Sequence, residues 1–151
     1  MDQTQMMLLE LGSKNYSCAQ ILLIGGLRLL GNDNPGLVRA MSGLGQGMGF
    51  GGTCGAFTGG ACLIGLYTGK GEDGELPLDN AALVLDEYCT WFRENFCAAN
   101  PAASCDGFLE LDGETGPRLM QPERCGAMVG RVWEKVISLL MENGIDPTMD
   151  R

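Results

Sequence analysis

Residues 43–67 read GLGQGMGFGGTCGAFTGGACLIGLY, and the interpretation of the whole chain starts from this stretch. Its first ten residues hold six of the 24 glycines of the chain. Glycine is unfavourable inside a helix or a strand because it loses more backbone entropy on ordering than other residues do. We therefore expect a glycine-rich loop that lets the main chain approach other groups closely. A central helix follows it, with Thr53 as N-cap, and ends near Tyr67.

Segments with helical spacing of apolar residues lie on both sides of this stretch. Ser17 is a good N-cap for a helix over 17–30, and Asn34-Pro35 opens a short helix over 35–42. The other expected helices cover 2–12, 78–98 with Asp79 as its cap, 105–111 and 122–143, and 112–118 is expected to be a loop. No segment shows the alternation of a strand. The chain is therefore predicted to be all-α, a compact multi-helix bundle that forms a single domain over 1–151.

Two of the expected helices have a distinct apolar face. The face of the helix over 78–98 consists of Leu85, Tyr88, Cys89, Phe92 and Phe96. The face of the last helix contains Cys125, Met128 or Val129, Val132, Val136, and Leu139 or Leu140, and Gly144 ends that helix. Cys97 falls on the polar side of its helix, close to Arg93 and Glu94.

The composition excludes several classes of function. The chain has 151 residues and no histidine, so Ser-His-Asp and Cys-His catalysis and histidine-ligated zinc or copper do not fit within it. A net charge of −9 opposes binding to phosphate backbones, so we expect no nucleic acid partner. The apolar run at 21–24 is too short to span a bilayer, so we expect no membrane insertion.

Seven cysteines are many for a domain of this size. The first residues lack the pattern of a secretory signal, so we expect a cytoplasmic protein, where clustered cysteines indicate metal or redox chemistry. Cys54 and Cys62 lie about 12 Å apart on one expected helix, too far for a disulfide. Cys62 and Cys89 are interpreted as core filler. Since no Cys-x-x-Cys occurs, a site with several cysteines must draw them from separate helices.

Three cysteines occupy the same local position. Cys18, Cys54 and Cys105 each follow a Ser or Thr that can cap a helix, so each is expected in a first turn. Unpaired N–H groups and the helix dipole favour negative charge there, which predicts thiols with a lowered pKa. Cys125 lies near the start of the last helix on its apolar side, so it can point inward to meet the other three.

The run 51–59, GGTCGAFTG, resembles the Cys-Gly-Ala-x-x-Gly element of the C_GCAxxG_C_C family. The order of the other features extends the resemblance over nearly the whole chain: Asn15, Cys18-Ala19-Gln20, the glycine-rich loop, Cys105 followed by Leu109, Leu111 and Asp112, and Cys125. The resemblance implies an all-helical fold and places the four family cysteines at Cys18, Cys54, Cys105 and Cys125. The stretch 98–101 and one extra residue after Asn15 depart from the pattern, so Cys97 stays open as the third member.

The resemblance also implies a redox or iron–sulfur role for the four cysteines. We expect them to ligate an iron–sulfur cluster, of the [2Fe–2S] type, for electron transfer or sensing. Backbone N–H groups of Gly51, Gly52, Thr53 and Gly55 are expected to bind its sulfurs. The alternatives are a metal-free thiol–disulfide protein in which the same cysteines are the catalytic redox thiols, a structural Cys₄ zinc site, and a helical interaction module. A redox partner protein is expected; a homo-oligomer and the substrate of any enzymatic reaction are left open.

Overall fold

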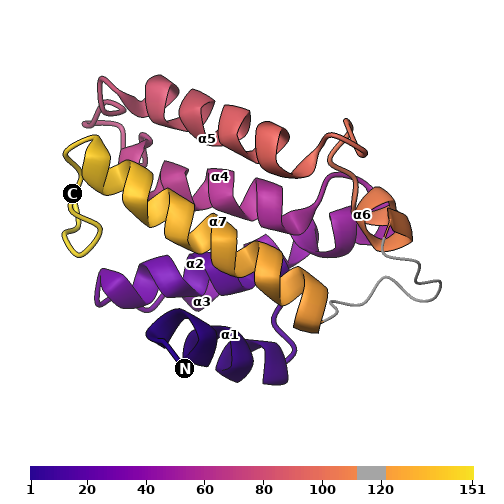
Figure 1. The fold of residues 1–151 in the computed structure, drawn as a ribbon. Coiled ribbons are helices and arrows are strands. Elements are labelled where there is room, and N and C mark those ends of the chain that lie inside the picture. Colours follow the sequence, from indigo (N-terminus) through magenta and orange to yellow (C-terminus); the bar gives the residue numbers. More distant parts are fainter. Residues whose placement is uncertain (112–121) are drawn as a thin grey trace.

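The computed structural model describes residues 1–111 and 122–151, and in these residues it contains seven α-helices and no strand (Figure 1). The helices are α1 (Gln3–Ser13), α2 (Cys18–Leu29), α3 (Pro35–Met41), α4 (Gly55–Thr68), α5 (Ala81–Phe96), α6 (Cys105–Leu111) and α7 (Pro122–Glu142). The prediction of an all-α bundle is confirmed. The loop expected at 112–118 lies outside the described residues.

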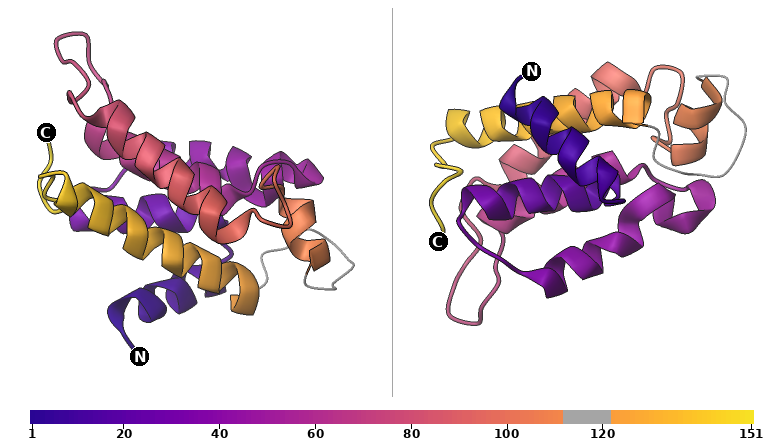
Figure 2. Two further views of the ribbon diagram at one scale, coloured as in Figure 1. Left: turned by 45° about the horizontal axis from the view of Figure 1, so that its top comes forward. Right: turned by 90° about the horizontal axis from the view of Figure 1, so that it is seen from below.

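Helix α4 lies in the middle of the bundle and packs against α2, α5 and α7 (Figures 1 and 2). Helix α1 packs on α7 and α2, and α3 packs on α2. The glycine-rich segment joins α3 to α4 through two short turns, η1 (Ser42–Leu44) and η2 (Gly47–Gly51). Helix α6 lies at the end of the bundle opposite the C-terminal tail and contacts η2 (Figure 1). This arrangement brings the starts of α2, α4, α6 and α7 to the same end of the bundle.

Two adjacent glycines allow α4 to approach its neighbours closely. A Cβ atom built on Gly59 would lie 2.7 Å from the Cα atom of Ala19 on α2. A Cβ atom built on Gly60 would overlap the Tyr88 hydroxyl and lie 2.8 Å from Cγ1 of Val132. Real Cβ atoms do not tolerate such distances, so glycine at these positions is required by packing rather than by backbone conformation.

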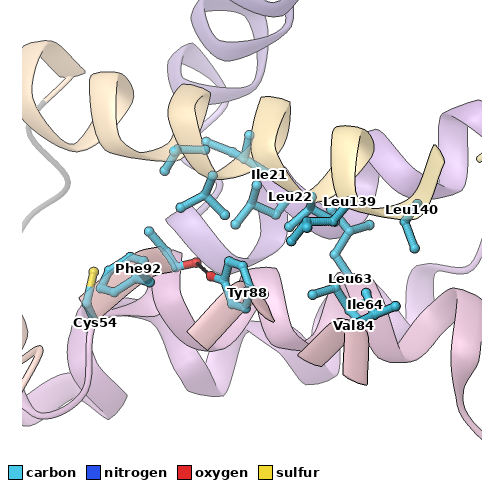
Figure 3. Packing of buried hydrophobic residues seen from close by; sticks show 14 of the residues in the cluster. Ile21, Leu22, Cys54, Leu63, Ile64, Val84, Tyr88, Phe92, Leu139 and Leu140 are labelled. Carbon is cyan, nitrogen blue, oxygen red and sulfur yellow. Dashed lines mark hydrogen bonds between the residues drawn. The ribbon is translucent and has the colours of Figure 1, made fainter. Parts of the chain in front are cut away.

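The core forms around α4 (Figure 3). Tyr88 and Phe92 of α5 are its largest fully buried side chains, and the Tyr88 hydroxyl donates a 2.8 Å hydrogen bond to the backbone oxygen of Phe57. The Phe57 and Phe92 rings stack with centroids 4.2 Å apart. Cys54 lies at the edge of this core beside Phe92 (Figure 3). The remaining buried members include Leu11, Ile21, Leu22, Leu63, Ile64, Val84, Val129, Val132, Val136, Leu139 and Leu140.

The apolar run at 21–24 is part of this interior. Ile21, Leu22 and Leu23 of α2 are almost completely buried. Leu23 also joins Ala19, Leu27 and Met41 in a smaller cluster between α2 and α3. Within residues 1–111 and 122–151, no helix has both the length and the apolar character needed to cross a membrane.

Local signals place most helix ends correctly, with two corrections on α5. Ser17 caps α2 in a capping box with Gln20, as expected for that position. Helix α5 has Asn80 rather than Asp79 at its N-cap. Leu85 is 39% exposed, whereas Val84 is fully buried, so the expected face is wrong at this position. Val84 and Tyr88 are four residues apart and therefore share the side of α5 that faces α4.

Candidate functional site

The thiols of Cys18 and Cys125 face each other where α2 meets α7. Cys18 is the first residue of α2, directly after its cap Ser17, and Cys125 lies close to the start of α7. The two side chains make a hydrogen-bonding contact. This contact is the largest influence that raises the pKa of the Cys18 thiol well above its ordinary value, followed by burial. The structure thus brings together two cysteines that are far apart in the sequence.

Cys54 and Cys105 are brought together by the main chain. Thr53 and Ser104 form an isolated antiparallel bridge. On either side of it, the N–H group of Cys54 donates to the oxygen of Ala103 at 2.8 Å, and the N–H group of Cys105 donates to the oxygen of Gly52 at 2.6 Å. Helices α4 and α6 therefore begin side by side, with one cysteine at the start of each.

All four predicted site cysteines share one electrostatic environment. The pKa of Cys18 is raised by its contact with Cys125 and by burial, and also by the charges of Cys125, Cys54 and Cys105. Burial raises the pKa of Cys54 to about 11, and the charges of Cys105 and Cys125 act in the same direction. The structure therefore places Cys18, Cys54, Cys105 and Cys125 in one group at one end of the bundle.

The expectation of lowered thiol pKa values is wrong for Cys18 and Cys54. The backbone N–H groups of Ala56 and Phe57, in the first turn of α4, do lower the pKa of Cys54 as the helix N-terminus predicts. Burial disfavours the thiolate more strongly, and each neighbouring thiolate would repel the next. The thiols of Cys18 and Cys54 therefore resist ionisation unless a nearby positive charge offsets their burial and the repulsion.

The glycine-rich segment contacts the starts of three helices. A Cβ atom on Gly45 would lie 2.8 Å from Cβ of Ser17, the cap of α2. A Cβ atom on Gly51, whose φ is +79°, would overlap the carboxyl group of Asp106 in α6. A Cβ atom on Gly55 would lie 3.0 Å from the backbone oxygen of Leu44. The segment thus holds α2, α4 and α6 at the spacing that gathers their cysteines.

The residues expected to bind a cofactor occupy this same segment. Gly52 donates its N–H group to the oxygen of Gly47 at 2.9 Å and accepts from Cys105. Thr53 does not cap α4, because it lies in the bridge with Ser104 and the N-cap is Cys54 itself. All four residues of this segment, Gly51, Gly52, Thr53 and Gly55, pack against other atoms of the protein. Their binding of a cofactor stays a prediction.

Met128 belongs to the same cluster; the sequence places it, or Val129, on the buried face of the last helix but does not predict its contact with a cysteine. The Sγ atom of Cys54 lies 3.8 Å from the Sδ atom of Met128. Met128 is three residues after Cys125 on α7, so both side chains lie on the same side of that helix. This spacing is the signal that could have found it, although methionine on a helix face is usually core packing.

The other three cysteines have different surroundings. Cys97 is the C-cap of α5 and only 7% exposed, so the expected polar position is wrong. The charge that acts on its thiol is that of Arg93, whereas Cys18 and Cys54 each interact with Cys105. This difference favours Cys105 over Cys97 as the third member of the group. Cys62 packs at the edge of the cluster between α2 and α3, and Cys89 at the edge of the main core.

The side chains form no ready-made cage of metal ligands in the part of the chain that the structure describes. Among the residues that the structure describes, no three or more Cys, Asp or Glu side chains converge as the ligands of a metal ion. The four cysteines lie within electrostatic range of one another, and Cys18 and Cys125 are in contact.

Comparison with known proteins identifies a family that this chain matches. A family model described as "Putative redox-active protein (C_GCAxxG_C_C)" matches residues 16–139, a range that includes all four cysteines of the group. The chain has no match among curated proteins or solved structures.

Proposed function

We propose a thiol–disulfide redox function for this chain, which belongs to the C_GCAxxG_C_C family. Cys18 and Cys125 are the exchanging pair in this proposal. The observation that supports it is that the Cys125 side chain is a hydrogen-bonding partner of the Cys18 thiol, so that the two side chains of α2 and α7 are neighbours. The family description supports redox activity, and the pair supplies a chemistry that needs no further group.

The exchange needs one thiol that attacks and one that completes it. The pKa of the Cys18 thiol is raised well above its ordinary value by its contact with Cys125 and by burial, so we propose that Cys125 attacks first. Its thiolate attacks one sulfur of a substrate disulfide, a mixed disulfide forms, and the first substrate thiolate leaves and takes up the proton that Cys125 released.

Cys18 completes the exchange. Its sulfur attacks the Cys125 sulfur of the mixed disulfide, the bond to the substrate breaks, and the proton of Cys18 passes to the second leaving thiolate. The protein ends with a Cys18–Cys125 disulfide, and the substrate disulfide has become two thiols. Two electrons and two protons have moved, and the reverse reaction reduces the protein.

A cluster on all four cysteines is the second proposal. The mutual influence of Cys18, Cys54, Cys105 and Cys125 on the thiol pKa values supports it, because a cationic centre would relieve their repulsion. Four thiolates are the usual complement of a [2Fe–2S] cluster. This proposal stands second because the four side chains do not converge as ligands, whereas one pair is already in contact.

Disulfide mapping after controlled oxidation tests the first proposal. Reduced protein is incubated with oxidised dithiothreitol, the remaining thiols are alkylated, and peptides are identified by mass spectrometry. We expect a Cys18–Cys125 bond that Cys18→Ser and Cys125→Ser abolish and that Cys62→Ala, the matched control, preserves. A protein whose Cys18 and Cys125 both remain alkylatable would disprove the proposal.

A spectrum of protein purified without oxygen separates the two proposals. Broad absorbance between roughly 400 and 600 nm with about two irons per chain would favour the cluster. A colourless protein that gives the Cys18–Cys125 bond favours thiol–disulfide exchange, and stoichiometric zinc would indicate a structural Cys₄ site.

A further inference from the structure

Two sulfur atoms from different helices meet beside the Cys18–Cys125 pair. The Sγ atom of Cys54 lies 3.8 Å from the Sδ atom of Met128, so α4 and α7 each bring one sulfur to this place. A metal–sulfur bond is about 2.3 Å long at zinc sites. Two sulfurs 3.8 Å apart can therefore both bind one ion, with an angle of about 110° at the ion. The contact thus has the dimensions of two ligands of one metal.

The bridge between α4 and α6 places a third sulfur on the same side. Thr53 and Ser104 are the bridged pair, so Cys54 lies opposite Ala103. Cys105 is two residues after Ala103, and residues two apart in extended backbone share a face. Cys54 and Cys105 are therefore diagonal neighbours, for which Cα atoms lie about 7–8 Å apart. A disulfide requires Cα atoms closer than about 7 Å, whereas an ion between the two sulfurs can span the longer distance.

The surroundings of Cys54 suit a bound cation. Its side chain is only 8% exposed and lies beside Phe92 (Figure 3). Burial raises the pKa of Cys54, and the charge of Cys105 raises it more than that of Cys125 does. A cation held by the thiolates of Cys54 and Cys105 would offset both the burial and their repulsion. The apolar surroundings would also limit the access of solvent to the metal.

The kinds of ligand select the metal. Thiolate and thioether are soft ligands that favour copper(I), and the chain has no histidine that would favour other metals. Structural zinc sites take four Cys or His ligands. Among the described residues, no group of three or more Cys, Asp or Glu is arranged to hold a metal ion. Copper(I) accepts fewer ligands than zinc, so two thiolates and one thioether are sufficient for it.

We infer that Cys54, Cys105 and Met128 form a copper(I) site that is separate from the Cys18–Cys125 pair. Binding breaks two S–H bonds and releases their protons to the solvent. Two thiolate–copper bonds and one thioether–copper bond form. The oxidation states of copper and sulfur do not change, so no oxidant or reductant is needed. The inference goes beyond the proposed function, because neither of the exchanging thiols takes part.

Competition for copper(I) tests the contribution of the thioether. Reduced full-length protein, freed of reductant and kept without oxygen, receives copper(I) in the presence of bathocuproine disulfonate, a chelator whose copper(I) complex is coloured. Met128→Leu keeps all seven thiols and a similar volume. It should weaken copper(I) binding roughly tenfold or more, since loss of even an outer-shell partner has this effect at other metal sites. Met41→Leu, a buried methionine between α2 and α3, is the matched control and should preserve the affinity. Equal affinities of the two variants would overturn the assignment of Met128.

The cysteine variants test the two thiolates. Cys54→Ser and Cys105→Ser should each weaken copper(I) binding roughly a hundredfold, whereas Cys62→Ala should preserve it. X-ray absorption at the copper edge should show only sulfur neighbours, at about 2.3 Å. If Cys54→Ser and Cys62→Ala bind copper(I) equally well, the metal binds to the thiols without preference and there is no such site. Far-ultraviolet circular dichroism of each variant checks that its helices are retained.

The oxidised protein separates this inference from the proposed function. Protein whose Cys18–Cys125 bond has been formed with oxidised dithiothreitol, and which has then been freed of dithiothreitol, should bind copper(I) as tightly as reduced protein. Weaker binding in this form, or in Cys18→Ser, would place the copper on the exchanging pair and overturn the separate site. If no Cys18–Cys125 bond forms, the proposed function fails, and the affinities of reduced Met128→Leu and Met41→Leu still decide the copper site.

Discussion

The Sγ atom of Cys54 and the Sδ atom of Met128 lie 3.8 Å apart and join the start of α4 to the first part of α7. Because the thioether accepts from the thiol, it favours the protonated form of Cys54. Met128→Leu keeps a similar volume and should change the free energy of unfolding by less than about 1.5 kcal/mol. Loss of this weak hydrogen bond should increase the rate of Cys54 alkylation at pH 8 about twofold.

Peptide mapping after brief iodoacetamide treatment measures that rate for Cys54 separately. Met41→Leu is the matched control, because Met41 is buried in the cluster between α2 and α3. An equal increase in both variants would mean that general loosening, and not the Cys54–Met128 contact, controls the reactivity.

The raised pKa of Cys54 predicts loss of stability in alkali. Burial raises this pKa from 9.0 to about 11. Between these pH values the unfolded chain has released the proton while the folded chain keeps it, so the free energy of unfolding falls with pH. The stabilisation is complete below pH 9 and is lost by about pH 11, with a slope of about 1.4 kcal/mol per unit for this thiol.

Urea unfolding of reduced protein at pH 8 and pH 10.5 measures this fall. Cys18 should add to it, because its contact with Cys125 and its burial raise its pKa in the same direction. Cys54→Ala should reduce the difference between the two pH values. An unchanged difference in that variant would show that other groups, such as Tyr67 with its pKa of about 12, account for the whole effect.

Gly60 should not tolerate even a methyl group. Its Cβ position overlaps the Tyr88 hydroxyl, which is held by its hydrogen bond to the oxygen of Phe57. Gly60→Ala is therefore expected to destabilise the protein by about 1–3 kcal/mol. Gly65→Ala on the same helix has open space and should stabilise the protein by up to about 1 kcal/mol. Thermal unfolding distinguishes them, and equal changes of the same sign would refute the packing argument.

Ser104 should stabilise the first turn of α6 and so slow hydrogen exchange in that helix. Its Oγ atom accepts from the N–H group of Gly107 at 3.0 Å, and its backbone oxygen accepts from the side chain of Asn100 at 2.9 Å. Ser104→Ala removes the cap and should cost about 1 kcal/mol. Hydrogen exchange should become faster in α6, while Ser138→Ala should leave α6 unchanged. Exchange that is equally slow in both variants would show that the bridge with Thr53 alone holds this helix.

Local sequence signals were sufficient to predict most of the helices. The capping pair Ser17 and Gln20 and the left-handed Gly144 depend only on their neighbours in the chain, so they mark helix ends without knowledge of the fold. The buried side of α5 could not be predicted in this way. Val84 rather than Leu85 is buried because α4 lies on that side, and the position of α4 is a tertiary property.

The four cysteines of the candidate site could be named from the sequence, but their contacts could not. Helix starts and the family pattern point to Cys18, Cys54, Cys105 and Cys125, the structure places these thiols within electrostatic range of one another, and their common role stays a prediction. Which two thiols are in contact depends on how α2 meets α7, and no pattern within either helix states that. The same limit affected the thiol pKa values, because the helix N-terminus is visible in the sequence whereas burial and the neighbouring thiols are not.

The bridge between Thr53 and Ser104 joins positions separated by about a third of the chain. Such a contact cannot form until the later segment has left the ribosome, and its loop closure makes it slow compared with helix formation. Cys18 and Cys54 therefore emerge during synthesis well before Cys105 and Cys125. In that interval the thiols of Cys18 and Cys54 lack the neighbours that the finished fold gives them, and they are correspondingly more accessible to other thiols and oxidants.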